Sequence, residues 1–168
     1  EGAIVTVYEP DPHNCTMIEK NLKINNLDAT IKQAALVHDD TKEVNMFIGN
    51  NNNVWRNSII KNWNGKGLKV PALNFEKEAE SVDCCKMDIE GAEMLILENL
   101  KHKFKKLVYE WSFDIDPSLE RVWRVIDKQK KDYRVEAAWN TICYNDKREH
   151  YWQQSWFPPC TNVFLFEK

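Results

Sequence analysis

Strand-like runs alternate with helical segments along this chain, and that order restricts the folds open to it. Runs of β-branched and aromatic side chains predict strands at residues 4–8, 29–37, 82–87 and 107–111. Helical segments follow the first, third and fourth of these runs. Strands that alternate with helices predict an α/β sandwich around a mostly parallel sheet.

The first of these helices has a clear start. Asp11 is a typical N-cap and Pro12 suits the first helical position. Met17, Ile18 and Leu22 follow at helical spacing, so we expect the helix to bury them. Two late strands, 133–139 and 162–166, are expected to pair antiparallel.

Size and composition limit the class of protein. The 168 residues, with 43% hydrophobic and 29% charged side chains, predict a single domain over residues 1–168. A net charge of −3 argues against a general nucleic-acid binder. No apolar run reaches the roughly 18 residues that span a bilayer. Five scattered cysteines without CxxC or zinc spacing read as reduced thiols, which favours a cytoplasmic location. Nothing in the sequence indicates the oligomeric state.

Acidic residues stand where the predicted strands end. In α/β sheets ligands bind beyond the carboxyl ends of the strands, and Glu9, Asp88, Glu90 and Glu110 occupy such positions. An acid in the place of Glu9 can accept hydrogen bonds from the ribose hydroxyls of a nucleoside. A solvated turn acid is the alternative, and NAD enzymes use the same device.

The stretch KMDIEGAEMLILENL, residues 86–100, sets three acids and a glycine between two apolar runs. If the chain stays extended, Asp88 and Glu90 point to the same face, where a metal, Lys86 or a polar ligand must relieve their repulsion. Glu93 falls in the first helical turn, where the helix dipole favours a carboxylate. On these residues alone, helix capping and a binding site are both open.

Two segments together resemble a known family. The segment VYEPDPHNCTMIEKNLKINN, followed by KMDIEGAEMLILENL, is similar to the FkbM-type methyltransferases. Further motifs occur in the family's order, and together they cover most of residues 4–111: QAALV at 33–37, RNSII at 56–60 and VPALNF at 70–75. The resemblance implies a Rossmann-like class I methyltransferase sandwich and S-adenosylmethionine as the cofactor.

The resemblance also implies roles for residues that bind the cofactor. Glu9 would hold the ribose hydroxyls of S-adenosylmethionine. Ala34 and Ala35, at the end of the predicted second strand, would lie by the adenine.

Other residues would serve the reaction itself. Asp88 would sit next to the methyl group and the acceptor, with Glu110 beside it at the next strand end. Glu90 and Lys86 would shape this site or orient the acceptor hydroxyl, although Lys86 also fits the description of an ordinary edge charge.

The reaction would be an O-methylation of a sugar hydroxyl or of another small metabolite. Such a hydroxyl needs a base, and a carboxylate whose pKa burial raises can serve. A divalent metal held by the same acids is a second route, which the sequence does not separate from the first. Residues 50–67 and 144–157, rich in Trp, Asn, Lys and Tyr, suit a glycan acceptor or are plain surface loops.

One departure from the family concerns the start of the chain. Glu1-Gly2-Ala3 stands directly before the first predicted strand, and no GxGxxG turn occurs. We therefore expect an N-terminally incomplete domain that lacks the first strand and the glycine-rich turn, and either a gap or a rearranged pairing between strands 4–8 and 82–87.

Two other functions remain possible at this stage. An NAD-type oxidoreductase retains the role of Glu9 but leaves the DIEG motif unexplained. A non-catalytic Rossmann-like binding domain accounts for the missing glycine turn.

Overall fold

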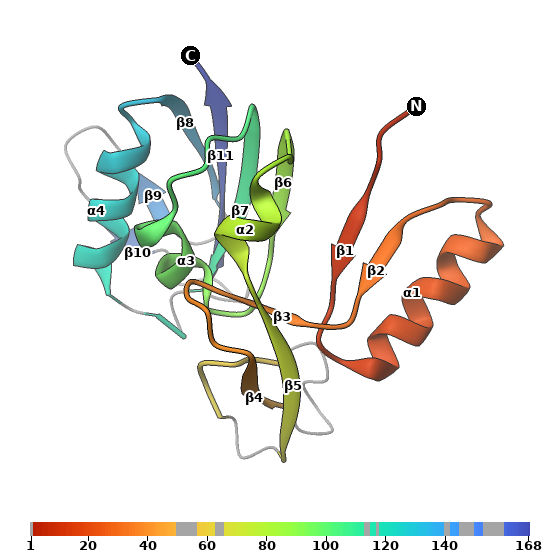
Figure 1. Ribbon diagram of the computed structural model, residues 1–168. Helices are drawn as coiled ribbons and strands as arrows, with labels where there is room; N and C mark the ends of the chain where they lie inside the picture. Colours follow the sequence, from red (N-terminus) through yellow and green to blue (C-terminus); the bar gives the residue numbers. More distant parts are fainter. Residues whose placement is uncertain are drawn as a thin grey trace. The chain divides into compact units, whose positions relative to one another are not determined.

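The computed structural model describes residues 2–49, 57–62, 66–112, 115–116, 118–139, 142–144, 150–152 and 160–168. The chain has a mixed α/β fold and forms two compact units, Glu1–Phe75 and Glu76–Lys168. Figure 1 shows the helices and strands of both units, coloured along the sequence.

The first unit begins with a parallel strand pair joined by a helix (Figure 1). Strand β1 (Thr6–Tyr8) pairs with β2 (Thr30–Lys32), and α1 (Pro12–Ile24) connects them. The predicted cap is confirmed, because the side chain of Asp11 accepts a hydrogen bond of 2.8 Å from the amide of His13.

Helix α1 buries a different set of side chains from the expected one. Cys15 is its buried residue, Ile18 and Leu22 are half-buried, and Met17 is 43% exposed. Cys15, Ile18 and Leu22 share one face at the spacing i, i+3 and i+7. Met17 lies about 200° around the helix from Cys15, so its expected burial was wrong.

The second sheet of this unit has the strand order β3-β5-β4. Strand β3 (Ala35–Val37) runs parallel to β5 (Gly67–Asn74), and β4 (Glu43–Phe47) runs antiparallel to β5. The single strand expected at 29–37 is therefore wrong. The amide of Ala34 donates to the carbonyl of Lys32 at 2.9 Å, and this tight turn sends β2 and β3 into different sheets.

The second unit contains a four-stranded sheet of order β6-β7-β11-β8. The members of this sheet are β6 (Cys84–Met87), β7 (Lys106–Ser112), β8 (Tyr133–Trp139) and β11 (Cys160–Glu167). Strands β6 and β7 are parallel, while β11 is antiparallel to both β7 and β8. The pairing expected between the two late strands is confirmed.

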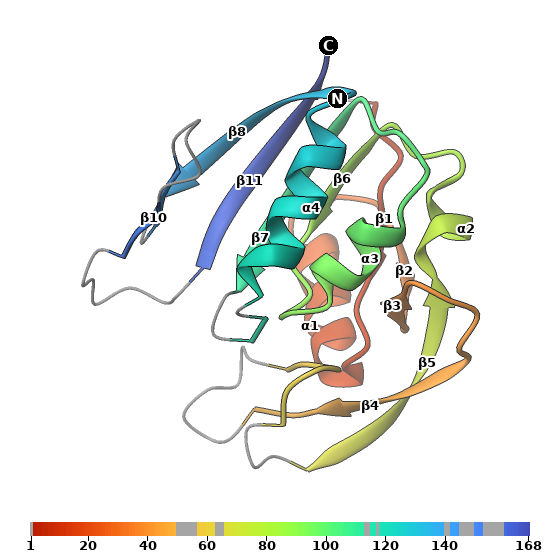
Figure 2. The same ribbon diagram turned by 90° about the vertical axis from the view of Figure 1, so that its left-hand side faces the viewer.

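Two helices cover one face of this sheet, as Figure 2 shows: α3 (Glu93–Asn99) and α4 (Leu119–Gln129). The core beneath them includes Met87, Leu107 and Tyr109 of the sheet, all at most 3% exposed. The hydroxyl of Tyr109 donates to Gln129 of α4 at 3.0 Å, which gives this buried group a partner. The unit also contains α2 (Phe75–Ala79) from Glu76 onward and the antiparallel pair β9 (Ile142–Tyr144) and β10 (His150–Trp152).

The sheets are mixed rather than mostly parallel. Among the described strands, three pairings are parallel and four are antiparallel. The antiparallel pairings arise because β4 folds back on β5 and because β11 lies between β7 and β8. Strand β1 pairs with β2 in one sheet, and β6 pairs with β7 in another. In the described residues, no helix has the length and apolar character that crossing a membrane requires.

Candidate active site

Two predicted catalytic acids belong to neighbouring strands of the second unit. Asp88 directly follows β6, whereas Glu110 lies within β7, two residues before that strand ends at Ser112. The strands are parallel, so their carboxyl ends share one edge of the sheet. The register pairs Met87 with Tyr109, and Asp88 and Glu110 are the residues that follow this last pair. Side chains alternate along a strand, so Glu110 faces away from the core position of Tyr109. Two of the predicted catalytic residues are thus neighbours on the side of the sheet opposite α3 and α4.

Lys86 joins Asp88 on that side. Its ammonium nitrogen lies 3.0 Å from Oδ2 of Asp88, in an ion pair between side chains that are 67% and 39% exposed. A pair this exposed adds little stability, because water screens it. Its structural consequence is that the side chain of Asp88 is oriented along the strand end.

Glu90 does not continue the strand. Its φ is +55°, and that of Gly91 is +104°, so the chain turns sharply where an extended segment was one expectation. The chain is therefore not extended through Glu90, and the condition under which Asp88 and Glu90 would point to the same face is not met. Glycine is required at 91 for a second reason, since a Cβ there would lie 2.2 Å from Cγ2 of Ile115.

Glu93 is the most buried acid of this region, with 1% of its surface exposed. Its two oxygens accept hydrogen bonds from the amides of Ile89 at 2.7 Å and Gly91 at 2.9 Å. Burial raises the pKa of Glu93 to about 7, and the negative charge of Asp88 adds to that rise. The two amides act in the opposite direction, because they stabilise the carboxylate.

Sequence reasoning assigned Glu93 only to the helix dipole and missed its contacts with the turn. No sequence signal set Glu93 apart, because an acid in the first turn of a helix is favoured there whether it is exposed or buried. A buried carboxylate needs internal donors, and the nearest ones are the amides of the preceding turn.

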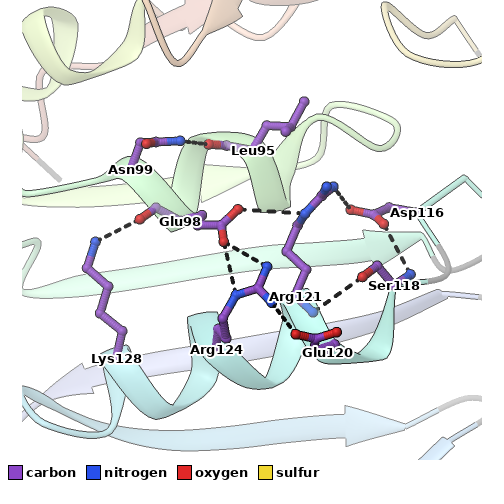
Figure 3. Close-up of polar contacts among 9 residues, drawn as sticks. All are labelled: Leu95, Glu98, Asn99, Asp116, Ser118, Glu120, Arg121, Arg124 and Lys128. Atoms are coloured by element: carbon purple, nitrogen blue, oxygen red, sulfur yellow. Dashed lines mark hydrogen bonds and ion pairs between the residues drawn. The ribbon is translucent and has the colours of Figure 1, made fainter.

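Helix α3, which carries Glu93, is fixed at its other end by α4 (Figure 3). Lys128 donates to the main-chain carbonyls of Glu98 at 3.1 Å and Leu100 at 2.6 Å, which satisfies carbonyls that a helix end leaves unpaired. The side chain of Glu98 accepts from Arg124 at 3.0 and 3.2 Å and lies 3.6 Å from Nε of Arg121. Ion pairs and caps together set the position of α3.

The segment after β7 is held by Asp116. Its carboxylate lies 2.8 Å from Arg121 (Figure 3). Its carbonyl accepts a hydrogen bond from the indole of Trp111 at 3.0 Å. Asp116 is 8% exposed, so this pair is more shielded from water than the ion pairs on the surface. These contacts fix the chain next to Ile115, the residue that packs on Gly91.

The first unit has its own strand-end acid. Glu9 follows β1, is half-buried, and accepts a hydrogen bond from the amide of Asp11 at 2.7 Å. Burial raises its pKa, while the hydrogen bonds from Asp11 and from the side chain of Asn14 lower it. Glu9 also donates its amide to Lys32 at 3.2 Å, which extends the β1–β2 pairing by one step.

Ala34 and Ala35 are both buried, at 4% exposure each. We expected them at the end of one long strand. They lie instead where this stretch breaks into β2 and β3. Ala34 follows the carboxyl end of β2, at the same edge of the parallel pair as Glu9, whereas Ala35 opens β3 in the neighbouring sheet.

Two amide residues were not among the residues predicted from the sequence. Asn57, within the RNSII motif, donates to Asp11 at 2.7 Å and accepts from the amide of Gly49 at 3.0 Å. Asn162 lies opposite Glu110 in the β7–β11 register and is half-buried. A single amide in the apolar run of β11 was the signal for Asn162.

The described residues contain no group of three or more His, Cys, Asp or Glu side chains that could hold a metal ion. The aromatic- and amide-rich stretches 50–67 and 144–157, suggested as acceptor loops, lie largely outside the described residues.

Comparison with known families adds one finding. The model of the methyltransferase FkbM domain matches residues 1–135. No curated protein and no solved structure matches the chain significantly.

Proposed function

Because the chain belongs to the FkbM methyltransferase family, we propose that it transfers a methyl group from S-adenosylmethionine to a hydroxyl of a sugar or another small molecule. The family match over residues 1–135 carries this proposal. The strand-end acids of both units support it, because they stand at the edges where α/β folds bind ligands. We also propose that the fold is a Rossmann-like class I methyltransferase sandwich.

Glu9 is proposed to bind the cofactor. A half-buried carboxylate directly after a strand suits the two ribose hydroxyls, each of which can donate to one carboxylate oxygen. The hydrogen bond from Asp11 fixes the orientation of the Glu9 side chain before any ligand arrives. The buried methyl groups of Ala34 and Ala35 would offer the adenine a small apolar surface.

Asp88 is proposed as the general base. S-adenosylmethionine, when bound, supplies the methyl group on a sulfonium sulfur. Asp88 would take up the proton of the acceptor hydroxyl as that oxygen becomes methylated. Lys86, 3.0 Å from Asp88, would hold this carboxylate in place, and Glu110 would accept a hydrogen bond from a second hydroxyl of the acceptor. Positioning of the acceptor supplies much of the rate in such a displacement.

Two measurements test the proposed function. Titration calorimetry with S-adenosylmethionine and with NAD distinguishes the methyltransferase from an oxidoreductase, and we expect binding of the first alone. Incubation with methyl-labelled cofactor and a panel of glycans and small polyols should transfer label to a hydroxyl. Binding of NAD in place of S-adenosylmethionine would refute the proposal. Binding of S-adenosylmethionine without transfer to any acceptor would favour a non-catalytic binding domain.

A further inference from the structure

Glu90, in the turn between β6 and α3, has a backbone conformation that glutamate does not favour. Glu90 has a φ of +55°, a left-handed conformation that side chains other than Asn, Asp and Gly rarely adopt. Gly91 follows at +104°. Such a turn persists only where its surroundings impose it, and residues of this kind cluster at functional sites.

Glu93 imposes the turn from inside. One carboxylate oxygen binds the amide of Ile89 and the other binds the amide of Gly91, so the acid bridges the two residues that flank Glu90. The start of α3 offers no substitute, because its N-cap residue, Ala92, makes no side-chain hydrogen bond. A single buried side chain thus determines the course of the backbone from Asp88 to the helix.

Ile115 restrains the same turn from outside. Its side chain packs against the Cα position of Gly91 so closely that a methyl group there would overlap Cγ2. Ile115 is next to Asp116, which Arg121 and Trp111 anchor. The turn is therefore held between a buried carboxylate and a fixed apolar side chain.

We propose that Glu93 is a positioning residue: by binding the amides of Ile89 and Gly91 it maintains the left-handed turn at Glu90 and so presents Asp88 and Glu90 to the methyl acceptor. The effect on methyl transfer rests on the proposed function, but the contacts of Glu93 can be tested without it. Glu93 itself does not touch the reacting atoms in this account. It acts through the backbone that carries the two acids.

The experiment compares the whole chain with Glu93→Gln and with a matched control, Glu80→Gln. Glutamine has the shape of glutamate but only one acceptor oxygen, so its amide nitrogen must face one of the two backbone donors. Glu80 is an exposed glutamate of the same unit. Amide hydrogen exchange, read by NMR at Ile89 and Gly91, reports the two bonds directly.

In the wild type both amides should be protected. In Glu93→Gln at least one should exchange about tenfold faster or more, as expected for the loss of one hydrogen bond. The control should leave both unchanged. Unprotected amides in the wild type, or equal protection in wild type and Glu93→Gln, would overturn the proposal. The measurement on the wild type tests the two hydrogen bonds even if the variant fails to fold.

Methyl transfer supplies the functional arm. Glu93→Gln should lower kcat about tenfold or more while the affinity for S-adenosylmethionine stays unchanged, because the error lies in the placement of the acids. If the role of Glu93 were only structural, the activity of Glu93→Gln would instead fall in proportion to the fraction of protein that is folded. Faster amide exchange with unchanged kcat would refute the positioning role. A wild type that transfers no methyl group would refute the proposed function, and amide exchange would then still test the contacts of Glu93.

Discussion

The buried acid Glu93 predicts a specific dependence of stability on pH. Its pKa in the folded protein is about 7, against the ordinary value of 4.5 expected after unfolding. Between these two values the folded state binds more protons than the unfolded state, so the free energy of unfolding falls as pH rises. The difference corresponds to a loss of up to about 3 kcal/mol between pH 4.5 and 8. The physical cause is the cost of ionising a carboxyl group that burial shields from water.

Glu93→Gln removes this titration. Urea unfolding at several pH values from 5 to 8 gives the free energy of unfolding of the wild type and of the variant as a function of pH. In the difference between the two curves, the contributions of the other ionisable groups cancel. We expect the wild type to lose stability relative to Glu93→Gln as pH rises, and the control Glu80→Gln to run parallel to the wild type. Parallel curves for wild type and Glu93→Gln would show that burial does not raise the pKa of Glu93 in the folded protein.

Three further predictions follow from the same geometry. Glu9→Ala should weaken binding of S-adenosylmethionine by about 1–3 kcal/mol, measured by calorimetry, and lost turnover with unchanged affinity would contradict its cofactor role. Gly91→Ala should lower the unfolding free energy by about 2–4 kcal/mol, of which Ile115→Ala in the same chain should restore the part due to overlap with Cγ2, while Cβ stays in place. Equal losses in the single and double variants would refute that contact. Because Asn162 lies opposite Glu110 in the β7–β11 register, we propose that it donates to the acceptor, so that Asn162→Ala should raise KM for the acceptor about tenfold. An unchanged KM would refute this role.

Local rules anticipated much of the fold. Asp11 and Pro12 mark the start of α1 because capping and a fixed φ depend only on neighbouring residues. The acid positions after β1 and β6 were also predictable, since an apolar run followed by a turn residue locates a strand end.

Features set by distant contacts were not predictable. The break between β2 and β3 has no glycine or proline to announce it, because Gln33 and Ala34 suit a continuous strand as well as a turn. The direction and position of β11 depend on which edge of β7 is open, a property of the assembled sheet. The alternation of strands and helices predicted mostly parallel pairings. Among the strands that the structure describes, antiparallel pairings are more numerous.

The candidate site divides in the same way. Residue type and position brought forward Asp88, Glu110 and Glu9, but the left-handed turn at Glu90 was not foreseen, since glutamate rarely adopts that conformation. Glu93 was overlooked because its importance lies in burial and in two backbone donors, neither of which the sequence states.

The central claim is that the acid at the end of β6 serves methyl transfer, and Asp88→Asn tests it most directly. Asparagine keeps the shape of the side chain and an oxygen that can accept from Lys86, but it cannot take up the proton of a hydroxyl. Single-turnover transfer of a labelled methyl group, with Asp28→Asn as an exposed control, should slow by at least about a hundredfold in Asp88→Asn while cofactor affinity is retained. Transfer at close to the wild-type rate would contradict the account and reduce Asp88 to a residue that caps a turn.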